Sequence, residues 1–213
     1  MPALRLGRLR IPWPGSADKD PYWDAFINRA PSDPRNALQE VLAHAAGGAV
    51  NPNRVELHTP EITAAHLKEL ATFLGAEQIG IVRLKDAESA DATESTDSEL
   101  GTRNSETPAE RYPFAIVCAV KADYDPRTAP GVGGQVPIRN GLFVTFTLAA
   151  YIREMGYRAT NQEPADPQRL AAAAGLGTLN AQGRLVPTPR GARIHIAHEV
   201  VHTDLPLAPD GEA

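Results

Sequence analysis

The chain has 213 residues and a formal net charge of −5, and it contains one cysteine. This length suits one domain with a sizeable core, or one domain with an arm. The acidic balance excludes a basic surface for nucleic acid or anionic membranes, and the sequence holds no apolar run long enough for a membrane helix. A single cysteine excludes a disulfide framework. Together with the lack of an apolar secretory leader, this predicts a cytoplasmic protein.

Residues 1–60 are predicted to form an arm rather than a domain. Prolines recur along this segment and prevent a long helix, whereas both tryptophans of the chain, Trp13 and Trp23, offer aromatic anchors. We expect the arm to wrap over the domain surface. A lid over a pocket is the alternative interpretation. Within the arm, Asp33 caps a short predicted helix over residues 35–46.

A helix and a strand open the predicted domain. Thr59, Pro60 and the apolar stripe behind them predict a helix over residues 61–74, followed by a strand over residues 79–84. The composition then shifts to small polar and acidic residues over residues 85–110. Such a segment buries too little apolar surface to offset its ordering entropy, so we expect a mobile, disordered loop.

The middle of the chain predicts a buried strand and a buried helix. Residues 113–120 form a continuous apolar run, typical of a strand that is covered on both faces, and Cys118 within it is expected to be a small buried side chain. Residues 121–140 are rich in turn-forming residues. Residues 141–157 are apolar nearly all round and predict the central helix.

The densest group of glycines and prolines lies in residues 170–207, where we expect the ligand site. A small-residue helix over residues 170–174 is followed by Gly175-Leu176-Gly177, whose backbone can turn freely and present N–H groups. Residues 193–201 alternate with period two, which predicts one half-buried strand. On such a strand His195 faces away from His198 and His202, so no metal site is predicted.

Two runs in this stretch resemble the C-terminal part of the corrinoid-binding domain of reductive dehalogenases and epoxyqueuosine reductase: AGLGTLNAQGRLVPTPRGARI and TDLPLAPD. Three earlier runs resemble preceding elements of the same domain: HLKELATFLGAEQIGIVRL, YPFAIVCAV and LAAYIREMGYRAT. The resemblance implies an α+β fold, a nitroreductase-like sandwich with a mixed, mainly antiparallel sheet flanked by helices. It places the domain at residues 61–207, with a tail at 208–213.

The resemblance also implies a cofactor, cobalamin, lying on the backbone of the GLG and TDLPL segments. The implied cofactor-binding residues are Gly175, Leu176, Gly177, Thr178, Asn180, Gly183, Thr203, Asp204 and Leu205. On the predicted strand, His198 or else His202 would face the ligand with an imidazole that approaches the cobalt or bonds to a corrin amide, and we take His198 as the candidate. By their position before the central helix, Tyr124 and Arg139 are candidate catalytic residues. Tyr124 is the candidate acid, because Asn140 has no proton to donate as a carboxyl group does. A structural role for each stays open.

One departure from the family affects the expected reaction. The family carries ferredoxin-type cysteine runs after TDLPL, whereas Cys118 alone cannot hold an iron–sulfur cluster. The expected function is therefore cluster-free redox chemistry or corrinoid processing. It would involve a small-molecule substrate and an external reductase or ferredoxin, with the protein acting alone or as a homodimer and without nucleic acid or membrane. The alternatives are an FMN-dependent, nitroreductase-like oxidoreductase and a non-enzymatic binding or assembly subunit.

Overall fold

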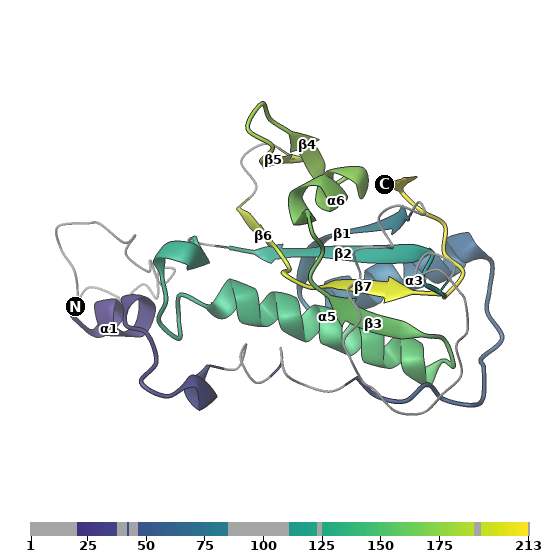
Figure 1. Ribbon diagram of the computed structural model, residues 1–213, viewed down its shortest axis with the longest axis horizontal. Coiled ribbons are helices and arrows are strands. Elements are labelled where there is room, and N and C mark those ends of the chain that lie inside the picture. Colours follow the sequence, from purple (N-terminus) through teal and green to yellow (C-terminus); the bar gives the residue numbers. More distant parts are fainter. Residues whose placement is uncertain are drawn as a thin grey trace, which may run out of the picture.

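A computed structural model describes residues 21–37, 42, 47–84, 111–122, 125–189 and 193–212. In these ranges the chain forms a mixed sheet with helices on both faces, which is the expected α+β class (Figure 1). Most of the predicted arm helix and the predicted mobile loop, residues 85–110, lie outside the described residues. None of the described helices is both long and apolar enough to cross a bilayer.

The described α-helices are α1 (Pro21–Asn28), α3 (Pro60–Phe73), α5 (Val136–Glu154) and α6 (Pro167–Ala173), and the 3-10 helices are η1 (Pro34–Asn36) and η3 (Pro126–Thr128). The strands are β1 (Ala76–Arg83), β2 (Phe114–Lys121), β3 (Ala159–Gln162), β4 (Gly177–Leu179), β5 (Leu185–Pro187), β6 (Ile194–Ile196), β7 (Val200–Thr203) and β8 (Gly211–Glu212).

The main sheet has the strand order β3-β7-β2-β1-β8, and β6 also pairs with β2. Only the β1–β8 pair is parallel among the described strand pairs. The sheet is therefore mixed and mainly antiparallel. A separate hairpin, β4–β5, lies over the sheet beside α6 (Figure 1).

Strand β2 lies at the centre of the core. All of its residues except Lys121 are buried, which confirms the prediction of a strand covered on both faces. Ile116, Cys118 and Val120 face the layer formed by α3 and α5, whereas Val117 and Ala119 face α6 and the hairpin. Because each β2 side chain has a packed layer above or below it, this strand contributes most to burial in the sheet.

The two principal helices begin for different reasons. Helix α3 starts as predicted, with the Thr59 hydroxyl accepting a hydrogen bond from the backbone N–H of Ile62 and with Pro60 in the first turn. Helix α5 begins five residues before the predicted start at Gly141. Its N-terminal end is held by contacts with residues outside the helix. The carboxamide of Gln135, the residue before the helix, donates hydrogen bonds to the carbonyls of Pro126 and Ala129, 2.8 Å in each case.

The predicted strand over residues 193–201 is interrupted, which corrects the sequence prediction. Ala197 donates its backbone N–H to Cys118, and Val201 pairs with Ile116. Only Val117 lies between those two β2 residues, while three residues, 198–200, lie between their partners. The strand thus carries a bulge with two extra residues, which separates β6 from β7.

Candidate ligand site

A cavity of about 680 Å³ lies beside β6. Strand β3 pairs with β7 but ends at Gln162, and Pro164 just beyond it has no N–H to continue a ladder. No described strand therefore pairs with the outer edge of β6, and the cavity lies where a longer β3 would run. Its lining comes from β6 and the bulge, η3, the start of α6 and the β4–β5 hairpin: Ala122, Asp125, Pro126, Arg127, Glu163, Pro167, Gln168, Arg184, Leu185, Pro187, Arg193, Ile194, His195, Ile196, Ala197 and His198.

Two histidines meet in this cavity. The ring centroids of His195 and His198 lie 5.1 Å apart. A regular strand would place residues three positions apart on opposite faces, so the prediction that His195 points away from His198 is wrong. The bulge at residues 198–200 is the physical reason, because it changes the direction of the chain between the two side chains.

His195 is the more constrained of the pair. Its Nε2 atom is buried and has no hydrogen-bond partner. Burial, followed by the neighbouring His198, lowers the pKa of His195 from 6.5 to about 4, and Asp125 opposes this shift. The imidazole is therefore neutral near pH 7, a form that can donate or accept one hydrogen bond or coordinate the metal of a cofactor.

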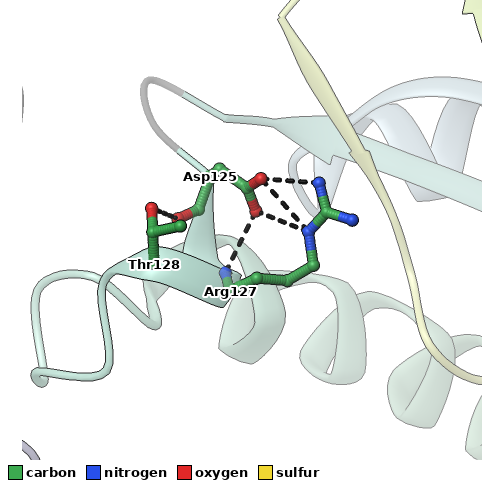
Figure 2. A network of polar contacts seen from close by, with 3 residues as sticks. All are labelled: Asp125, Arg127 and Thr128. Carbon is green, nitrogen blue, oxygen red and sulfur yellow. Dashed lines mark hydrogen bonds and ion pairs between the residues drawn. The ribbon is translucent and has the colours of Figure 1, made fainter.

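An ion pair on η3 forms one wall of the cavity (Figure 2). The Asp125 carboxylate accepts hydrogen bonds from the backbone N–H of Arg127 at 3.0 Å and from its guanidinium, with the Nη2–Oδ2 distance at 2.6 Å. Thr128 donates its hydroxyl to the Asp125 carbonyl. The hydrogen bond from Arg127 holds the pKa of Asp125 below its usual value, so this carboxylate stays charged and balances Arg127.

The predicted glycine segment packs against the protein itself. Leu176 is buried in the core layer below α6, and Gly177 pairs with Pro187 in the hairpin. A Cβ at Gly177 would lie 2.2 Å from the carbonyl oxygen of Val186. Gly175, at φ +78°, has open space where a Cβ would be. These three residues and the exposed Thr178 do not line the cavity, and their contact with a cofactor stays a prediction.

Asn180 and Gly183 form the hairpin turn. The Asn180 side-chain oxygen accepts the backbone N–H groups of Gln182 and Arg184, and its own N–H donates to the Arg184 carbonyl. Gly183 adopts a φ of +71°, which glycine reaches without a steric cost. Neither residue lines the cavity, although the adjacent Arg184 does.

The remaining predicted residues lie in three places. Thr203 is the last residue of β7, and Asp204 and Leu205 follow it; the polar groups of all three bond to the protein. Arg139 is half-buried in the first turns of α5 and does not line the cavity. Tyr124 lies outside the described residues. Their roles in binding and catalysis stay predictions. Among the members of the predicted set that the structure describes, only His198 lines the cavity.

Sequence reasoning missed His195, Gln168, Arg184 and the Asp125–Arg127 pair as members of one site. The available signal for the pair was Asp125-Pro126, a capped turn before Arg127. No local pattern marked His195, because strict alternation assigned it to the other face. Within the described ranges, no group of three metal-binding side chains converges.

Comparison with known proteins identifies the fold. No family model and no curated protein matches the sequence. Among solved structures, the catabolic reductive dehalogenase NpRdhA in complex with 3-bromo-4-hydroxybenzoic acid matches over 87% of this chain with 24% identity and a TM-score of 0.61. A reductive dehalogenase described with a mechanism for B12-dependent dehalogenation also matches over 87% of the chain, with 24% identity and a TM-score of 0.58.

This chain spans 27% of the length of each of those two dehalogenase chains. Epoxyqueuosine reductase from Bacillus subtilis matches more distantly, with 15% identity and a TM-score of 0.46 over 70% of this chain and 47% of that one. The chain thus shares its fold with part of the reductive dehalogenases.

Proposed function

We propose that this protein binds a corrinoid in the cavity beside β6 and serves redox or corrinoid-processing chemistry, on a nitroreductase-like sandwich. The single observation that carries the proposal is the buried, unpartnered Nε2 atom of His195, which lies beside His198 in the cavity lining. A buried polar atom without a partner costs free energy, and a ligand that reaches it removes that cost. The reductive dehalogenase fold supports a corrinoid as that ligand.

The residues present fit one side of a corrinoid. Ile194, Ile196 and Leu185 offer apolar contacts to the macrocycle, while Gln168 and Arg184 offer hydrogen bonds to its amide-bearing periphery. When bound, the corrinoid supplies a cobalt centre for reduction or ligand exchange. The chain itself binds and orients the group, keeps two imidazoles beside it, and excludes water from the apolar side of the cavity.

The proposal requires an electron donor outside the described chain. Cys118 is fully buried in β2, and burial raises the pKa of its thiol to about 12. Such a thiol is protonated and inaccessible, so it cannot serve as a cluster ligand. A reductase or ferredoxin is the partner that the proposal implies, and a small molecule bound next to the corrinoid is the substrate.

A second candidate is a non-enzymatic binding or assembly subunit. The observation in its favour is that the GLG and TDLPL residues are engaged in packing, a hairpin ladder and hydrogen bonds within the chain. Residues that already pack and form hydrogen bonds within the chain can be explained without a cofactor. FMN, the alternative cofactor, is tested in the same experiment.

An anaerobic titration with hydroxocobalamin, and separately with FMN, tests the proposal by visible spectroscopy and calorimetry. We expect corrinoid binding by the wild type and by His66→Ala, and binding weakened about tenfold or more by His195→Ala. His66 is a matched control because it pairs with His58 at a ring distance of 5.7 Å, away from the cavity. Binding of neither cofactor would favour the assembly subunit. Equal corrinoid affinity in all three proteins would remove His195 from the site.

A further inference from the structure

We infer that helix α1 positions the Asp125–Arg127 wall of the cavity, so that ligand binding in the cavity and docking of α1 are coupled. The inference rests on the proposed function in one respect, namely that the cavity binds a ligand. It adds a regulatory role for a helix of the N-terminal segment. Figure 1 shows α1 beside the teal segment that leads from β2 into α5 and includes η3.

Backbone hydrogen bonds fasten α1 to the loop that follows η3. The last turn of a helix leaves carbonyl groups that have no partner inside the helix. In α1 the loop supplies two of these partners: Phe26 accepts the backbone N–H of Gly133 at 2.9 Å, and Ile27 accepts that of Gly131 at 2.7 Å. Because a backbone N–H moves only with its chain, these bonds fix the loop relative to the end of α1.

The loop approaches α1 so closely that only glycine fits at two positions. A Cβ at Gly131 would lie 2.5 Å from backbone atoms of both Phe26 and Ile27, and a Cβ at Gly133 would lie 2.3 Å from the Phe26 ring. The Ile27 side chain is buried and packs with Ala129. These contacts give α1 one defined docking position on the loop.

The docked loop is tied to the cavity wall. Ala129 and Pro126 both present their carbonyl groups to the carboxamide of Gln135, at 2.8 Å in each case. Pro126 lines the cavity together with its neighbours Asp125 and Arg127. A displacement of the loop at Ala129 therefore reaches the wall through η3 and through the shared Gln135 contact.

Helix α1 depends on this docking. It has eight residues, and helices of fewer than about 12 residues are marginal in water on their own. Release of α1 therefore melts the helix and removes the support of the loop, whereas docking orders both. A ligand that needs the ordered wall binds more tightly when α1 is docked. By linkage, the same ligand favours docking by the same factor.

Two variants weaken the docking of α1 without replacing a residue of the cavity lining: Gly131→Ala and Ile27→Ala. Their matched controls are Gly47→Ala, where a Cβ meets no atom within 4 Å, and Ile62→Ala, which shortens an isoleucine that is 43% exposed. Hydrogen exchange followed by mass spectrometry reports on the wall without any ligand. We expect residues 125–136 to exchange about tenfold faster in both α1 variants than in the wild type and the controls, with β2 still protected.

The same proteins are then titrated with hydroxocobalamin and, separately, with FMN. We expect both α1 variants to bind the cofactor about tenfold more weakly than the controls, and saturating cofactor to slow exchange of residues 21–28 in the wild type. Unchanged exchange of residues 125–136 in the α1 variants would overturn the inference. Equal cofactor affinity in all of these proteins would also overturn it and leave the proposed function standing. If neither cofactor binds, the proposed function fails, and the exchange of residues 125–136 still decides whether α1 positions the wall.

Discussion

The Asp204 carboxylate holds both the backbone and the side chain of Arg158. It accepts the Arg158 N–H at 2.7 Å and the Arg158 Nε at 2.8 Å, while Thr203 donates its hydroxyl to the Arg158 carbonyl at 2.8 Å. These contacts fasten the end of β7 to the start of β3. The TDLPL segment therefore has a structural role in this chain, whatever ligand it meets.

Replacement of Asp204 by asparagine should destabilise the protein by about 1–2 kcal/mol, because the charge-assisted bond to the Arg158 guanidinium is lost in a half-buried setting. Asp33→Asn is the matched control, since Asp33 makes the same kind of contact with Arg35 on the exposed surface. An exposed pair contributes little to stability. Urea unfolding of both variants measures the difference. Equal midpoints for the two variants would show that the Asp204 contact stabilises the fold no more than the exposed Asp33 contact does.

A pair of glycine variants separates packing from ligand contact in the GLG segment. Gly177→Ala places a Cβ 2.2 Å from the Val186 carbonyl and should cost about 1–3 kcal/mol, because the β4–β5 hairpin must shift. Gly175→Ala meets no atom within 4 Å, so only its positive φ opposes the substitution, at about 1 kcal/mol. Thermal unfolding without cofactor measures both costs. If Gly177→Ala leaves stability unchanged and weakens only cofactor binding, Gly177 serves the ligand.

The sequence predicted elements whose signals are local and failed where tertiary contacts decide. The Thr59 cap placed α3 within one residue, and the apolar run of β2 predicted a strand buried on both faces. The start of α5 depends on Gln135 bonding to η3, which no helical pattern records. Strict alternation over residues 193–201 also hides the bulge, because the extra residues are visible only against the register of β2.

Local sequence patterns predicted the candidate site less well than the fold, because tertiary contacts assemble it. His198 was predicted from its strand, but the residues around it come from η3, α6 and the β4–β5 hairpin. These segments are brought together because β3 stops at Gln162 and leaves the outer edge of β6 uncovered. Pairing between strands that lie far apart in the sequence decides which sheet edge stays uncovered. Hydrophobic periodicity and strand propensity carry no information about that pairing.

Cys118 should not react with thiol reagents in the native protein. The side chain is fully buried in the central strand, and burial raises the pKa of the thiol to about 12, so the reactive thiolate is nearly absent at neutral pH. Labelling with a chromogenic disulfide should proceed only as the sheet opens, with the rate rising along the urea unfolding curve. Rapid labelling of one thiol per chain in native buffer would contradict the burial of β2.

Acidification should destabilise the protein through its buried histidines. Burial lowers the pKa of both His195 and His202 from 6.5 to about 4. Between these values the unfolded chain binds protons that the native state does not, so stability is fully present above pH 6.5 and falls as pH drops toward 4. Replacement of His202 by glutamine, which does not titrate, should reduce the loss seen between pH 7 and pH 5.

Urea unfolding at a series of pH values measures this loss, and His66→Gln, which replaces an exposed histidine, is the control for the substitution itself. Glu199 acts in the opposite direction, because burial raises the pKa of its carboxyl group and its protonation favours the native state as pH falls. That contribution is common to the wild type and to His202→Gln, so it cancels when the two are compared at each pH. If the two proteins lose stability equally between pH 7 and pH 5, His202 takes up its proton as readily in the native state as in the unfolded chain.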